Sequence, residues 1–146
     1  MATHYDTGRV PGWYWAVALA ARVWNGFGCF MYLSQVGMDP AEMAKLPQVQ
    51  QEVWRAMPAW AIGAYAIAVW VGLLGAIGLL LRRPWARLAF GVSLAGVVVQ
   101  FGWTFLGTPI LARMGGSAAV FPAFIFFVAA SLLCFSEMAT KRGWLR

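Results

Sequence analysis

Four long apolar segments alternate with short polar ones along the chain. The apolar segments cover about residues 13–36, 58–81, 88–106 and 118–139. At ~1.5 Å of rise per helical residue, each is long enough to cross a hydrocarbon layer of about 30 Å. The pattern predicts an all-α fold in which one domain, residues 1–146, forms an integral membrane four-helix bundle.

The first two apolar segments are joined by the only sizeable polar connection. It starts with Asp39-Pro40-Ala41-Glu42, the residue types of an N-cap, a proline at N1 and a glutamate at N3. Apolar residues then recur at helical spacing opposite a polar face: Val49, Val53, Trp54 and Met57. We expect a short amphipathic helix on the outer membrane surface that leads into Pro58. It can cap the bundle, which we favour, or act as a lid or docking surface.

Composition narrows the class of protein. Of the 146 residues, 62% are hydrophobic and 11% are charged, and the mean hydropathy is +0.68. A soluble domain carries about 25% charged residues, so this chain has too few to cover a globular surface. An ordinary soluble enzyme, a disordered tail and a secreted disulfide scaffold are therefore excluded, and one small membrane domain remains.

The net charge of +6 comes from basic residues at the ends of the apolar segments. Seven of them fall on one side of the predicted bundle: Arg9, Arg82, Arg83, Arg87, Lys141, Arg142 and Arg146. Three fall on the other side: Lys45, Arg55 and Arg113. The positive-inside rule then places both termini in the cytoplasm. We expect these basic groups to contact membrane lipid rather than nucleic acid.

Most of the tryptophans fit the role of interfacial anchors, because they lie near the ends of the predicted spans. On the cytoplasmic side the expected aromatic anchors are Trp13, Tyr14, Trp15, Trp85 and Trp144, and on the outer side Trp54 and Trp60. Trp24, Trp70 and Trp103 fall inside spans and are less easily explained in this way.

Residues for catalysis or metal binding are scarce. Cys29 and Cys134 belong to different spans, and the only histidine is His4. We find no Ser/His or Cys/His pair, no carboxylate pair and no nucleotide-binding motif. We therefore expect no enzyme activity, no metal site and no cofactor. The N-terminal residues lack the pattern of a cleaved secretory signal, so we expect the first span to be retained.

One arginine lies inside a span. Arg22 is near mid-depth of the first apolar segment, where an ionisable group is costly and indicates a possible site. Its side chain can extend to the cytoplasmic interface, or it can pair with Glu137 near the cytoplasmic end of the last span. We give the two alternatives similar weight.

Two buried amides are expected near the same depth. Asn25 lies one helical turn beyond Arg22, and Gln100 lies within the third span. Side-chain amides often form hydrogen bonds between helices in a membrane, so we expect these two to bond to each other. The predicted half-buried polar pocket consists of Arg22, Asn25, Gln100, Glu137, Trp24, Trp70 and Trp103.

Glycines recur every third residue in the second span, at Gly72, Gly75 and Gly78. Small residues let membrane helices approach closely. The repeat indicates either packing inside the bundle, which we favour, or a seam between two copies of the chain.

Several short motifs are shared with known small membrane proteins. They are Val23-Trp24-Asn25 and Tyr32, Pro58-Ala59-Trp60, Ala68-Val69-Trp70 with Gly72 and Leu74-Gly75, Leu79-Leu80-Leu81-Arg82-Arg83, Trp85-Ala86 and Ser93-Leu94. With them the chain resembles a family of small bacterial four-span inner-membrane proteins loosely catalogued as "sugar transporter" or uncharacterised, and more distantly DoxX-like proteins. The resemblance implies a bacterial inner-membrane location. Relatives often carry an acidic residue before the tyrosine, where this chain has Met31, so proton-coupled transport is not implied.

Two functions fit these observations. The first is a transporter or binder of a small polar, sugar-like solute, with amides for hydrogen bonds and tryptophans for stacking. Four spans enclose a narrow interior, so transport would need a homo-oligomer. The alternative is an accessory or structural subunit of a larger inner-membrane complex, in which the apolar spans contact partner proteins.

Overall fold

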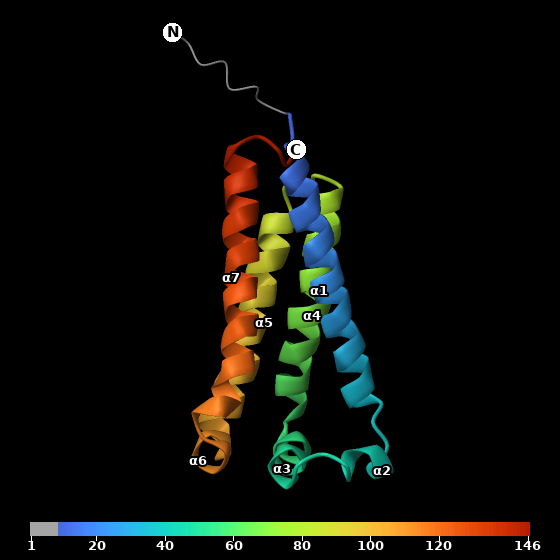
Figure 1. The fold of residues 1–146 in the computed structure, drawn as a ribbon, viewed down its shortest axis with the longest axis vertical. Helices are drawn as coiled ribbons and strands as arrows, with labels where there is room; N and C mark the ends of the chain where they lie inside the picture. Colours follow the sequence, from blue (N-terminus) through green and yellow to red (C-terminus); the bar gives the residue numbers. More distant parts are fainter. Residues whose placement is uncertain (1–8) are drawn as a thin grey trace.

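A computed structural model describes residues 9–146, so His4 lies outside the described residues. Its fold is built from four long helices, α1 (Gly12–Val36), α4 (Ala59–Leu80), α5 (Ala86–Gly107) and α7 (Val120–Lys141) (Figure 1). All four are long and apolar enough to cross a membrane, as expected of a small integral membrane protein. The four helices predicted from the apolar segments are confirmed, with each boundary within two residues of the observed one.

The beginning of α1 and the end of α7 lie at the same end of the bundle, which we call the terminal end (Figure 1). The opposite end, which we call the loop end, carries the short helices α2 (Pro40–Met43), α3 (Gln48–Ala56) and α6 (Ile110–Met114). A 3₁₀ turn, η1 (Gly116–Ala119), leads from α6 into α7. Across the loop end, Glu52 of α3 forms an ion pair with Arg113 of α6.

The first connection contains two short helices instead of the single one expected. Asp39 caps α2 as predicted: the Glu42 backbone N–H donates to Asp39 Oδ1 over 2.8 Å, and the Asp39 N–H donates to Glu42 Oε2 over 3.4 Å. The chain leaves the helix after Met43, and Pro47 becomes the N-cap of α3. The position of α3 on a membrane surface stays a prediction, as does the orientation of the termini.

The long helices pack in the order α1, α4, α5, α7. Small residues on α4 make this packing close. A Cβ at Gly72 would lie 2.3 Å from Asn25 Oδ1 of α1, and one at Gly75 would lie 3.0 Å from the Phe90 ring of α5. The glycine repeat therefore serves packing inside the bundle, the alternative that the sequence favoured. The backbones of α1 and α7, at the two ends of this series, are not closely packed against each other.

Aromatic side chains join α1 to α7 at the terminal end. Tyr14 is fully buried, and its hydroxyl donates to the Leu79 carbonyl over 2.5 Å. Its ring lies 5.6 Å from Phe135 of α7 and 5.9 Å from Trp144, centroid to centroid. Trp13 also contacts both of these rings. We call Trp13, Tyr14, Phe135 and Trp144 the terminal cluster.

Tyr14 and Trp144 were both expected to be interfacial anchors, and both expectations are wrong, because the two residues are buried, with exposures of 0% and 6%. The chain reverses after α7 at Gly143, whose φ of +72° suits glycine. The reversal packs Trp144 against Trp13 and Tyr14, in the first turn of α1. The Trp144 carbonyl accepts a 2.8 Å hydrogen bond from Arg82 Nε, and the Arg146 N–H donates to the Arg82 carbonyl over 2.8 Å.

Candidate functional site

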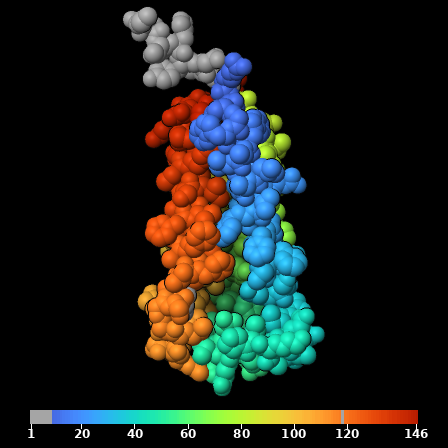
Figure 2. All heavy atoms as spheres, viewed as in Figure 1, coloured from blue at the N-terminus to red at the C-terminus, as the bar shows by residue number. Residues whose placement is uncertain are grey.

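A cavity of about 230 Å³ lies among the four long helices. Its walls are mostly aromatic and aliphatic, with a few uncharged polar groups. They comprise Trp24, Asn25, Phe27, Gly28, Met31 and Gln35 of α1; Tyr65, Ala68 and Val69 of α4; Phe90, Ser93, Val97, Gln100 and Phe101 of α5; and Phe121, Ile125 and Ala129 of α7. Figure 2 shows a recess between α1 and α7 in the half of the molecule nearer the loop end.

Asn25 and Ser93 bring polar groups to the α4 side of the cavity. Asn25 Nδ2 donates to the Ala21 carbonyl one turn earlier over 2.9 Å, and Asn25 Oδ1 lies against Gly72. Ser93 Oγ donates to the Ala68 carbonyl over 2.6 Å. The absence of a side chain at Gly72 leaves room for both groups, since a Cβ there would also lie 3.0 Å from Ser93 Oγ. Side chains of α1 and α5 therefore meet on the backbone of α4.

Gln100 faces the same cavity as Asn25 but does not bond to it. Gln100 Nε2 lies 3.5 Å from Thr104 Oγ1, and that hydroxyl donates to the Gln100 carbonyl over 3.0 Å. The expectation that the two amides bond to each other is wrong. The helix α4 lies between α1 and α5, and each amide bonds to a partner on its own helix instead. Within residues 9–146, the long contact to Thr104 is the one hydrogen bond of the Gln100 side chain.

Of the three tryptophans expected in the pocket, only Trp24 lines the cavity. Its ring lies 5.4 Å from Phe124 of α7. Trp70 is two residues from both Ala68 and Gly72, so at ~100° per residue it projects to the opposite side of α4, where it is 40% exposed. Trp103 lies beside Gly107 of its own helix instead, since a Cβ at Gly107 would be 3.1 Å from the indole ring. The predicted cluster of three stacking tryptophans is therefore not formed.

Most of the cavity wall was not identified from the sequence. One missed signal was the spacing on α5, where Ser93, Val97 and Gln100 recur on one helical face. Because Gln100 was expected to be buried, this spacing indicates that Ser93 faces the cavity too. Tyr65 had no comparable signal. Its ring makes an edge contact with Tyr32 at 5.1 Å between centroids, and it lines the cavity from α4.

Arg22 lies away from the cavity and from α7. Trp13 and Trp24 both contact α7, which identifies the face of α1 that looks toward that helix. Arg22 is two residues from Trp24, about 200° around the helix, and its side chain is exposed. Of the two alternatives for Arg22, the pair with Glu137 is therefore wrong. Among residues 9–146, Arg22 forms no ion pair and no side-chain hydrogen bond.

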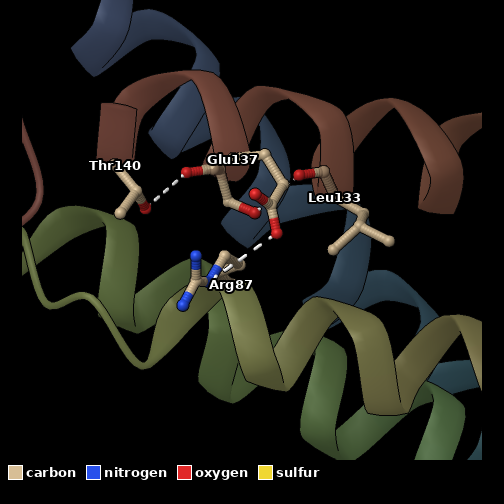
Figure 3. Close-up of polar contacts among 5 residues, drawn as sticks. Arg87, Leu133, Glu137 and Thr140 are labelled. Carbon is tan, nitrogen blue, oxygen red and sulfur yellow. Dashed lines mark hydrogen bonds and ion pairs between the residues drawn. The ribbon is translucent and has the colours of Figure 1, made fainter. Parts of the chain in front are cut away.

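Glu137 instead pairs with Arg87, at the beginning of α5. Glu137 Oε1 lies 3.6 Å from Arg87 Nε (Figure 3). The two side chains are 42% and 49% exposed, respectively. The pair joins α5 to α7 near the terminal end and takes no part in the cavity.

Because this ion pair is half exposed and longer than a hydrogen bond, we expect it to contribute little to stability. A double-mutant cycle with Arg87→Gln and Glu137→Gln should give a coupling free energy of about 0.2–1 kcal/mol, decreasing with added salt. Reversible unfolding in mixed micelles measures it. A coupling above about 2 kcal/mol would show that the pair is shielded from solvent in the membrane.

The resemblance to small four-span inner-membrane proteins stays a prediction, because no family model, curated protein or solved structure matches this chain.

Proposed function

We propose that this chain is a small non-enzymatic membrane protein that binds a small molecule in the cavity between α1, α4, α5 and α7. The observation that carries the proposal is the placement of amide side chains among aromatic rings inside a cavity. Asn25 and Gln100 are only 9% and 8% exposed, yet both line it. A mostly apolar cavity with a few convergent polar groups is the usual form of a small-molecule site.

The cavity lies within the four candidate spans rather than on a loop. Asn25 is near the middle of α1, and Gln100 is in the second half of α5. A polar group at such a depth is costly unless it has a hydrogen-bond partner. A ligand that bonds to the Gln100 amide would satisfy a group whose own helix provides only a 3.5 Å contact. A sugar-like solute, moved by an oligomer of the chain, is one form of this function.

The alternative function, an accessory subunit of a larger membrane complex, is favoured by the outward face of α7. Phe126 and Phe127 of this helix do not line the cavity and are 40% and 66% exposed. Either lipid or a partner protein can cover such a face. Extraction in a mild detergent separates the two cases, because a subunit retains a stoichiometric partner and a stand-alone protein does not.

The ligand site can be tested with a single reporter, because Asn25 is the only asparagine of the chain. Protein labelled with ¹⁵N-asparagine in lipid nanodiscs has a single labelled side-chain amide group, and its pair of N–H resonances is the Asn25 signal. Aqueous and organic extracts of the expressing cells serve as probes. We expect one extract to shift the Asn25 signal saturably.

Two matched variants on α7 locate the binding. Ala129 lines the cavity, whereas Ala123 is exposed and does not. Ala129→Trp should abolish the shift by filling the cavity, and Ala123→Trp should preserve it. A cooperative thermal unfolding transition of each variant shows that it is folded. If neither extract shifts the signal, or if both variants respond as the wild type does, the proposed function is wrong.

A further inference from the structure

We infer that the ligand is an uncharged amphipathic molecule of the lipid phase that enters the cavity sideways, between α1 and α7. This inference rests on the proposed function, since it names the chemical class and the entry route for the same cavity. It departs from the sugar-like solute that the sequence suggested.

The entry route follows from where α1 and α7 touch. At the terminal end, Trp13 and Tyr14 contact Phe135, at 5.9 and 5.6 Å between ring centroids. Farther along, the pairing of Trp24 with Phe124 at 5.4 Å is the last ring contact between the two helices among the described residues. Beyond this pair, toward the loop end, the helices stand apart and the cavity opens (Figure 2).

Exposed apolar side chains frame this opening. Phe27 and Met31 of α1 are 51% and 36% exposed, and Phe121 of α7 is 59% exposed, while all three also line the cavity. They belong to helices that are apolar enough to cross a membrane, so the surface around them is suited to hydrocarbon rather than water. A molecule dissolved in the bilayer can therefore reach the cavity without passing through water.

The lining determines the charge of the ligand. It contains no acidic or basic side chain, so a charged head group would be buried without a counter-ion. The polar groups at the inner wall, from Asn25, Ser93 and Gln100, are neutral hydrogen-bonding groups. Since Asn25 and Gln100 have both carbonyl and N–H₂ groups, they can accept from a hydroxyl or donate to a carbonyl.

The size and polarity of the cavity determine the shape of the ligand. About 230 Å³ is below the range of about 300–1,000 Å³ that is typical of drug-sized sites, so a ring-sized head group fits. A sugar has hydroxyl groups all around its ring, and most would face aromatic or aliphatic walls without a partner. A molecule with one polar end and an apolar body matches the lining, because its tail can extend through the opening into lipid.

Three pure probes test the ligand class on the ¹⁵N-asparagine-labelled protein in nanodiscs. They are 4-pentylphenol, which is neutral and amphipathic, 4-pentylbenzoate, its anionic counterpart, and glucose. We expect 4-pentylphenol to shift the Asn25 signal saturably. At equal concentration in the bilayer, 4-pentylbenzoate should bind at least about tenfold more weakly, because its charge finds no partner, and glucose should have no effect.

A fourth probe tests the route. 4-Hexadecylphenol has the same head group but stays in the bilayer, so it can reach Asn25 only through a lateral opening. We expect it to give the same shift as 4-pentylphenol. Ala129→Trp should weaken the binding of both phenols by at least about tenfold, because the indole occupies the space of the head group. Ala123→Trp should leave the affinity for both phenols unchanged.

The outcomes separate the two proposals. If glucose shifts the signal and the phenols do not, the ligand class is wrong while the proposed binding function stands. If 4-pentylphenol binds but 4-hexadecylphenol does not, the lateral route is wrong. If neither the pure probes nor the cell extracts shift the signal, the proposed function fails together with the inference.

Discussion

Replacing Trp144 by alanine should lower the free energy of unfolding by about 3–5 kcal/mol, the usual cost of truncating a buried tryptophan. The Trp144 ring is 6% exposed and makes edge contacts with Trp13 and Tyr14 at 5.4 and 5.9 Å between centroids. Removing it leaves a void beneath α1, which neighbouring rings fill only in part. Reversible unfolding of the purified protein in mixed micelles measures the loss.

Trp60 provides the matched control, because it lies at the beginning of α4 and is 58% exposed. Trp60→Ala should cost less than about 1 kcal/mol, as expected for a surface position. If Trp144→Ala lowers the free energy of unfolding by no more than this control does, then Trp144 does not pack against the first turn of α1 in the membrane. The distinction matters for the cavity, since the terminal cluster holds α1 and α7 together at one end while they stand apart at the other.

The four spans could be predicted from the sequence because lipid imposes a simple requirement. A helix must be about 20 residues long and almost free of charge to cross a membrane, and any sequence that meets this condition is easily recognised. The breaks at Pro58 and near Pro84 mark the ends of the segments equally clearly. Length and hydropathy therefore gave all four long helices to within two residues at each boundary.

The face that each helix presents to the others was harder to predict. In water, polar residues mark the outside of a helix, but in lipid both faces are apolar and this signal is lost. The remaining signal is residue size. The buried positions of α4 are almost all alanine or glycine: Ala61, Ala64, Ala68, Gly72, Gly75, Ala76, Gly78 and Leu79. The phase of these small residues would have placed Trp70 on the outward face.

The same reasoning explains why the sequence identified Asn25 and Gln100 as cavity residues but did not predict their hydrogen-bond partners. A polar residue within an apolar segment indicates burial, so both were expected inside the bundle, and both are there. Their partners depend on the order in which the helices pack. Since α4 lies between α1 and α5, each side chain bonds within its own helix. Helix order has no local signature in the sequence.

Gly96→Ala should destabilise the bundle by about 1–3 kcal/mol, although alanine is the better helix former. A Cβ at Gly96 would lie 2.8 Å from the Ala64 carbonyl oxygen and 3.0 Å from the Ala68 nitrogen, both backbone atoms of α4. Unlike a flexible side chain, a helix backbone cannot move aside by itself, so α5 must separate from α4. The loss appears as a lower unfolding free energy in mixed micelles.

Gly102→Ala is the control on the same helix, because a Cβ there would have no heavy atom within 4 Å. It should leave stability unchanged or raise it by up to about 1 kcal/mol through helix propensity. Separation of α4 and α5 would also lengthen the 2.6 Å hydrogen bond from Ser93 to the Ala68 carbonyl at the wall of the cavity. Gly96→Ala should therefore shift the Asn25 amide signal as well, and Gly102→Ala should not. Equal stability of the two variants would show that α4 and α5 are not in backbone contact at Gly96.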